Sequence, residues 1–121
     1  MSTSPKDSII SFSYNWNNKL DCKAFTTLRL RSNKYVPGTL YDVYLEKKGS
    51  NAIYLGKARC EKVKTLMLED INEFISFLDT GYNVADCKRI VRRMYNKENP
   101  EMILVLFVWT KRAEQDAQET K

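Results

Sequence analysis

The longest apolar stretch of the chain extends without interruption from Met102 to Trp109. It is too short to cross a bilayer as a helix, which takes about 20 apolar residues. A strand that is covered on both faces has such a continuous apolar sequence, whereas a half-exposed strand alternates. We therefore predict a strand over residues 101–110 that is a central strand of a β-barrel, with neighbours on both sides.

Two helices are predicted directly before this strand, because apolar residues there recur at intervals of three or four. The first is expected over about 68–79 and should end at Gly81, a residue type that commonly terminates helices. The second should begin after Asn83, with Asp86 three residues later completing a capping pattern. One face of this second helix is apolar, and the other carries Lys88, Arg89, Arg92 and Arg93.

The N-terminal half is predicted to contain further strands, because β-prone residues there are separated by turn signals. Their expected ranges are about 8–15, 24–31, 40–46 and 52–64. The asparagine-rich residues 15–19 are predicted to form a loop, in which Trp16 either covers the core or stacks on a ligand. Residues 1–7 and 113–121 lack apolar anchors, so we expect a disordered lead and a flexible tail around a single domain, 8–112.

Strand alternation assigns two faces to the strand at 24–31. Leu28 and Leu30 share one face, which we expect to be the core face. Thr27 and Arg29 share the opposite face. In the strand at 52–64, the small residues Gly56 and Ala58 share a face, and we interpret them as the site of tight barrel curvature.

Composition excludes several classes of function. The 121-residue chain has a net charge of +5, which permits but does not require binding to phosphate backbones. It has no histidine, which excludes Ser-His-Asp and Cys-His catalysis and His-ligated zinc. Cys22, Cys60 and Cys87 are far apart, so we expect buried or partly buried thiols rather than a disulfide framework or a zinc site. The N-terminus has no signal-peptide pattern, and we expect a cytoplasmic protein with no membrane association, metal or cofactor.

The order of the predicted elements, together with four short motifs, resembles the ASCH family. The motifs are Phe25-Thr26-Thr27-Leu28-Arg29, Tyr35-Val36-Pro37-Gly38 before a Tyr/Val strand, Gly56-Lys57-Ala58, and Asp79-Thr80-Gly81 before a helix that closes on Met94-Tyr95. The resemblance covers roughly residues 20–110. It implies an α+β fold, namely a PUA-like small mixed β-barrel of about five to six strands with two flanking helices.

Members of the ASCH family are linked to RNA, and some small bacterial members are amidohydrolases that remove an acyl group from acetylated cytidine. Their site resembles a Lys-x-x-Thr-x-Arg strand with a carboxylate between the helices. Matching Thr27 and Arg29 to this pattern puts Ala24 at the lysine position. Lys23 is one residue earlier, so it lies on the strand face opposite to that of position 24 unless a bulge intervenes. Asp79 lies near the expected carboxylate, and Thr80 is the alternative match.

These residues lead to two hypotheses of function. The first is an RNA- or nucleotide-binding protein that uses a basic cleft between barrel and helices, where cations would contact phosphate and an aromatic ring would stack on a base. The alternative for the helical cations is a solvated face with no ligand. The candidate binding residues are Thr26, Arg29, Arg31, Lys57, Arg59, Tyr82, Arg89, Arg92, Arg93 and Trp16.

The second hypothesis is a small amidohydrolase that acts on an acylated nucleoside such as acetylated cytidine. Thr27 would be the nucleophile or would orient water, and Lys23 would be the base after its pKa is lowered by burial or a nearby cation. Asp79, or alternatively Glu73, would orient these groups. Arg29 would hold an anionic group or a developing oxyanion.

Overall fold

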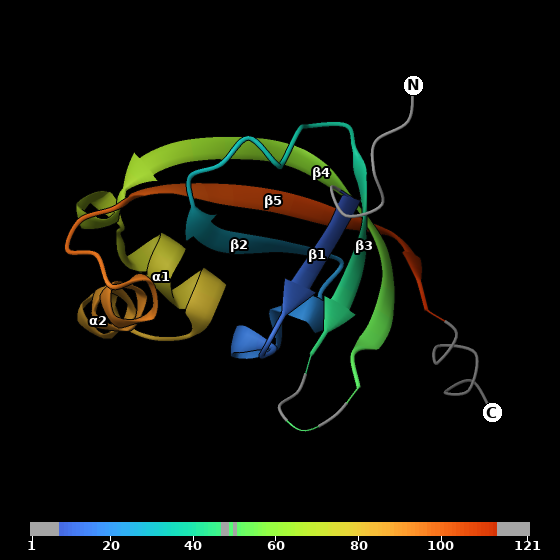
Figure 1. Ribbon diagram of the computed structural model, residues 1–121, viewed down its shortest axis with the longest axis horizontal. Coiled ribbons are helices and arrows are strands. Elements are labelled where there is room, and N and C mark those ends of the chain that lie inside the picture. The colour runs from blue at the N-terminus through green and yellow to red at the C-terminus, as the bar shows by residue number, and fades with distance from the viewer. Residues whose placement is uncertain (1–7, 47–48, 50, 114–121) are drawn as a thin grey trace.

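A computed structural model describes residues 8–46, 49 and 51–113, and it shows a curled sheet with two α-helices beside one end (Figure 1). The strands are β1 (Ile9–Phe12), β2 (Ala24–Leu30), β3 (Leu40–Leu45), β4 (Ile53–Met67) and β5 (Glu101–Arg112). The α-helices are α1 (Glu73–Thr80) and α2 (Val84–Tyr95), and the 3-10 segments are η2 (Trp16–Asp21) and η3 (Leu68–Asp70). None of the helices in these ranges is long and apolar enough to cross a membrane.

The sheet has the strand order β1-β3-β4-β5-β2. Strands β1 and β3 are parallel, and the other neighbouring pairs are antiparallel. The two longest strands, β4 and β5, form the middle of the sheet and pair along most of their length. This order makes β1 and β2 the two edges, and the curl brings these edges toward each other as a half-barrel (Figure 1).

Irregular pairing along β4 accompanies the curl of the sheet. The register with β3 shifts between Val43 and Tyr44, and the register with β5 shifts next to Lys57 and again after Cys60. Such shifts bend a strand and increase its twist. Gly56 lies among them with φ +132°, and a Cβ there would overlap the carbonyl oxygen of Lys111. Gly56, which we interpreted as a site of tight curvature, is therefore also the place where the neighbouring strand β5 approaches closely.

Two apolar clusters stabilise the fold, one on each side of the sheet. The larger cluster fills the inside of the curl and includes Phe25, Tyr41 and Phe107, which contact one another or common neighbours. The smaller cluster lies between the sheet and the α-helices and includes Leu68, Ile71, Cys87, Val91 and Met102. Residues of β5 belong to both clusters, in agreement with its continuous apolar sequence.

The helix ends follow local sequence signals. The Asn83 side chain accepts a hydrogen bond from the Asp86 amide at 2.8 Å and begins α2, as predicted. Gly81, in the left-handed region at φ 82°, ends α1, also as predicted. The predicted start of α1 at residue 68 is wrong, because η3 comes first and Asn72 caps α1 by accepting from the Ile75 amide.

The α+β class and the curled mixed sheet are confirmed, but several finer predictions are wrong. The first strand ends at Phe12 rather than near residue 15, and residues 16–21 form η2 rather than an open loop. On β2, Phe25 and Thr27 are the buried residues of the inner face, whereas Leu28 and Leu30 are half-buried against the helical cluster. Both faces of β2 are therefore covered.

Of the thiols, Cys60 and Cys87 are buried as expected, but Cys22 is exposed, and all three are free. The expected lead, 1–7, and residues 114–121 of the expected tail lie outside the described residues.

The first prediction concerns Gly56. Gly56→Ala should lower the free energy of unfolding by about 3 kcal/mol or more, because the substitution adds left-handed strain to an overlap with the β5 backbone. Gly38→Ala is the matched control: its φ is also positive, +92°, but a Cβ there would meet nothing within 4 Å. In this control, the free energy of unfolding should fall by only about 1–2 kcal/mol. Urea unfolding measures both, and equal losses would contradict the close approach at Gly56.

Candidate functional site

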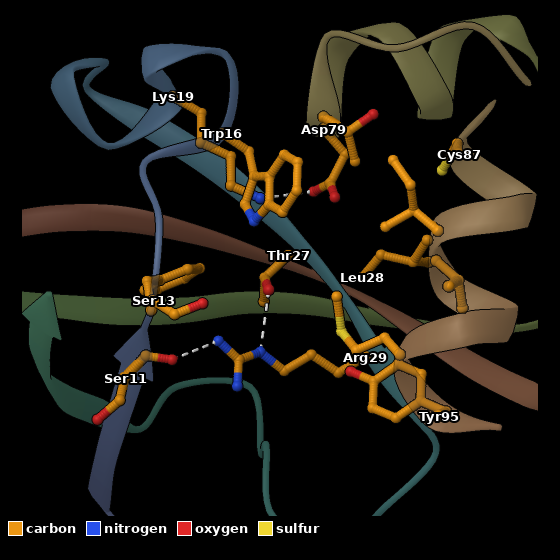
Figure 2. A pocket seen from close by; sticks show the side chains of 15 residues that line it. Ser11, Ser13, Trp16, Lys19, Thr27, Leu28, Arg29, Asp79, Cys87 and Tyr95 are labelled. Atoms are coloured by element: carbon orange, nitrogen blue, oxygen red, sulfur yellow. Dashed lines mark hydrogen bonds and ion pairs between the residues drawn. The ribbon is translucent and has the colours of Figure 1, made fainter. Parts of the chain in front are cut away.

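The candidate site is a pocket of about 160 Å³ that lies where the two edge strands of the sheet approach each other (Figure 2). One wall comes from β1 and the residue that follows it, including Ser11 and Ser13, and another from β2, including Thr27 and Arg29. The 3-10 segment η2 contributes Trp16 and Lys19. The helices α1 and α2 complete the lining with Asp79, Thr80, Cys87, Ile90, Val91, Met94 and Tyr95.

A buried ion pair forms one side of this pocket. The Lys19 ammonium donates a hydrogen bond to Asp79 Oδ1 at 3.0 Å, and the two side chains are only 6% and 5% exposed (Figure 2). The Thr26 hydroxyl donates to the same oxygen at 2.8 Å. Burial lowers the pKa of Lys19 below its usual value, and the neighbouring Asp79 carboxylate opposes this effect only in part. The lysine that reaches the pocket is therefore closer to losing its proton than an exposed lysine.

The conformation of η2 directs Lys19 into the pocket. Asn17 and Asn18 both adopt the left-handed region, at φ 56° and 54°, which asparagine tolerates better than most residues. The Asn17 side-chain amide donates to the carbonyl oxygens of Phe77 and Leu78 at 3.1 and 3.5 Å. These carbonyls lie in the last turns of α1, so this contact fixes η2 next to the helix that carries Asp79.

Arg29 forms the opposite side of the pocket and bridges the two sheet edges. Its Nε donates to Thr27 Oγ1 at 3.0 Å, and its Nη2 donates to the Ser11 carbonyl oxygen at 2.8 Å (Figure 2). The guanidinium carbon lies 4.8 Å from the centre of the Phe12 ring. This arrangement holds the arginine against the pocket wall and orients the buried Thr27 hydroxyl.

An aromatic group adjoins the site at Trp16. The indole ring makes edge contacts with Tyr14 and Tyr82, with ring centres 5.0 and 5.7 Å apart. Trp16 is half-buried, whereas Tyr14 and Tyr82 are exposed. Trp16 therefore lines the pocket and also packs against the two neighbouring tyrosines.

The remaining wall is apolar and comes from α2. The Cys87 thiol is buried there, and burial raises its pKa, so it is protonated and unreactive at neutral pH. Ile90, Val91 and Met94 lie beside it in the lining. The pocket thus combines a polar side with an apolar side, the composition typical of small-molecule sites.

Several of the predicted site residues meet at this pocket. Thr27, Arg29, Asp79 and Trp16 line it, and Thr26 reaches Asp79 from β2. Thr80, the alternative match for the carboxylate, also lines the pocket, but its hydroxyl donates to the Ser76 carbonyl oxygen at 2.8 Å.

Lys23 does not line the pocket. It is exposed directly before the first residue of β2, and Lys19 supplies the buried amine instead. Sequence spacing missed Lys19, because it lies in an irregular segment whose fold depends on the contact between Asn17 and α1. The run of asparagines before it was the only signal of an unusual backbone.

The other predicted cations do not line the pocket. Three of them form ion pairs elsewhere, Arg31 with Glu101, Lys57 with Asp42 and Arg59 with Glu61. Arg92 pairs with Glu98 near the end of α2, and Tyr82 contacts Trp16 without lining the pocket. Arg89 and Arg93 line a second hollow beside it. The cations of the predicted basic cleft are thus dispersed, and among the described residues only Lys19 and Arg29 bring positive charge into the pocket.

Comparison of the sequence with models of known protein families and with curated proteins finds no match. Within the described ranges, no group of three or more His, Cys, Asp and Glu residues is arranged to hold a metal ion. We therefore infer the chemistry of the pocket from its own side chains.

The second prediction tests the buried pair. Lys19→Met or Asp79→Asn alone should lower the free energy of unfolding by about 3–5 kcal/mol, because each change leaves a buried group without its partner. The double variant removes both charges and keeps an oxygen that can accept from Thr26. We expect it to be more stable than either single variant in urea unfolding. Additive losses would show that the two residues do not interact.

Proposed function

We propose that the pocket binds the base of a nucleoside or nucleotide. Pockets for drug-sized ligands have volumes of about 300–1,000 Å³, so a pocket of about 160 Å³ suits one small ring system rather than a larger molecule. A planar base can lie between the apolar wall of α2 and the polar side formed by Lys19 and Asp79. Trp16 offers an aromatic surface for stacking, which proteins commonly use for unpaired bases.

The hydrogen-bonding groups of the pocket suit the edge of a base. The Lys19 ammonium has three donors and uses one for Asp79. The Arg29 guanidinium has five donors, more than its hydrogen bonds to Thr27, Ser11 and Tyr35 use. Both hydrogen bonds to Asp79 end on Oδ1, which leaves Oδ2 as an acceptor for an exocyclic amine. The observation that carries this proposal is this pairing of donors and an acceptor with an apolar wall in one small pocket.

The same proposal includes that the chain is a member of the ASCH family and that its sheet is a PUA-like barrel. The curled mixed sheet with helices at one end supports it. So does the position of Thr27, Arg29 and Asp79 around one pocket.

The third prediction fills the pocket. Ile90→Trp should abolish nucleoside binding, because Ile90 lines the pocket and an indole there would occupy the space of a base. Ala85→Trp places the same ring at an exposed position of the same helix and should bind as the wild type does. Calorimetric titration with the four common ribonucleosides measures both. The proposal fails if the wild type binds none of them at millimolar concentration, or if Ile90→Trp binds equally well.

A second candidate function is hydrolysis of an amide on an acylated nucleoside. The specific observation in its favour is the lowered pKa of Lys19, in the same pocket as Thr27 and Asp79. The neutral amine would take a proton from water or from the Thr27 hydroxyl, and the activated oxygen would add to the carbonyl carbon. When water adds, the C–N bond breaks, the proton passes from Lys19 to the released amine, and the acyl group leaves as a carboxylic acid. When Thr27 adds, the C–N bond breaks, the proton passes from Lys19 to the released amine, and the acyl group stays on Thr27 as an ester. A water molecule that Lys19 deprotonates then hydrolyses this ester, which releases the carboxylic acid, and the proton returns to the Thr27 oxygen. Arg29 would stabilise the developing oxyanion.

The fourth prediction tests this chemistry with acetylated cytidine. Lys19→Met and Thr27→Val should each abolish release of acetate, whereas Lys23→Ala, which changes an exposed lysine outside the pocket, should have no effect. The rate should rise with pH until Lys19 is deprotonated, because only the free amine is a base. Since burial lowers this pKa, the rate should stop rising at a pH below 10.5, the ordinary pKa of lysine. Wild-type inactivity, or an unaffected Lys19→Met variant that is folded by circular dichroism, would exclude hydrolysis.

A further inference from the structure

A second hollow adjoins the pocket across one side of α2. It is lined by Arg89, Ile90, Arg93 and Met94 and has a volume of about 410 Å³. Ile90 and Met94 also line the first pocket. The same two apolar side chains therefore border both hollows, and a ligand that extended out of the pocket over them would come to the two arginines.

The two arginines are exposed at this hollow and differ in their partners. Arg89 pairs with Asp86 one helical turn earlier, with 2.7 Å between Nη2 and Oδ1, and its side chain is 58% exposed. Arg93 is exposed, and no residue of the described chain forms an ion pair or a hydrogen bond with its guanidinium. Arg92, between them, is held elsewhere, because its Nε donates to the Glu98 carbonyl oxygen at 2.6 Å. Of the three arginines of α2, two therefore line the hollow, and the third donates to a carbonyl oxygen just beyond the C-terminal end of the helix.

The size of the pocket explains why a ligand would reach this far. A volume of about 160 Å³ suits a base but leaves a sugar and phosphate outside. Ile90 and Met94 offer an apolar surface at the point where the ligand leaves the pocket. Guanidinium groups match the geometry of phosphate oxygens with paired hydrogen bonds, and two of them lie directly beyond.

We propose that the ligand is a nucleotide rather than a nucleoside, and that Arg89 and Arg93 form its phosphate subsite. This proposal rests on the proposed function, because it assumes a base in the pocket. It adds a class of ligand, a phosphorylated nucleoside, and a site on α2 separate from the polar groups around Asp79. Arg89 shares its charge with Asp86, whereas Arg93 has no ion pair among the described residues. Arg93 therefore contributes most of the affinity for phosphate.

The experiment compares each ribonucleoside with its 5′-monophosphate and its 3′-monophosphate by calorimetric titration at low salt. For the preferred base, we expect one of the monophosphates to bind about tenfold more tightly than the nucleoside, a gain that corresponds to charge-assisted hydrogen bonds. The gain should shrink as salt is raised, because exposed charges are screened. If nucleosides bind and phosphate adds nothing, this inference is wrong while the proposed function stands. If none of the compounds binds, the proposed function is wrong, and the inference with it.

Variants locate the gain on the two arginines. Arg93→Gln, and more completely Arg89→Gln/Arg93→Gln, should reduce monophosphate affinity to that of the nucleoside and leave nucleoside affinity unchanged. Arg31→Gln/Arg59→Gln removes the same charge from exposed residues that line neither hollow, and it should keep the gain. A loss of the gain in both double variants would assign it to net charge and would overturn the subsite.

A further titration separates the two sources of a phosphorylated nucleoside. A single-stranded tetranucleotide that contains the preferred base carries phosphates on both sides of that base. Binding at least as tight as that of the monophosphate would identify a nucleotide within RNA as the ligand. Weaker binding would identify the free mononucleotide, with the subsite retained in both cases.

Discussion

The buried pair of Lys19 and Asp79 is the contact on which the pocket depends. It joins η2 to α1, and the Thr26 hydroxyl on the same carboxylate oxygen adds β2. Two charges lose their hydration here, and their attraction compensates for that loss only when geometry and hydrogen bonds are good. The three elements must therefore keep one arrangement. Burial removes the hydration of both charges, and it also lowers the pKa of Lys19. The pocket therefore contains an amine that loses its proton more readily than a surface lysine.

The pocket also depends on incomplete closure of the sheet. Edge strands expose backbone groups that need partners. At the approach of β1 and β2, the Arg29 guanidinium provides one by donating to the Ser11 carbonyl oxygen. A side chain is longer than a backbone hydrogen bond, so it holds the edges apart while joining them. The space left between them is bordered by Thr27, Phe12 and the helices, and this space is the pocket. The lining of the candidate pocket and the approach of the two sheet edges thus share one residue, Arg29.

The sequence predicted the parts of the fold that have a regular period. The bounds of α2 and β2 were close, and strand alternation placed Thr27 and Arg29 on one face, because period and alternation are local properties. Asp79 was indicated only by the resemblance to a family motif. The prediction failed where structure depends on distant contacts. Lys19 reaches the pocket only because Asn17 binds the end of α1 from 60 residues away along the chain. Lys23 precedes the first residue of β2 and is exposed, and it became a candidate only because it lies one residue from the lysine position of the family motif.

The left-handed asparagines of η2 have a consequence for how such a pocket changes over evolution. An amine supplied by an irregular segment is not tied to a strand register or a helical period. A relative could lengthen or shorten this segment and still present a lysine to the same carboxylate from another position in the chain. Homologous sites would then share the positions of atoms in space but not the spacing of residues. Relatives of this chain are accordingly better sought by superposing the amine, the carboxylate and the guanidinium than by aligning a linear pattern.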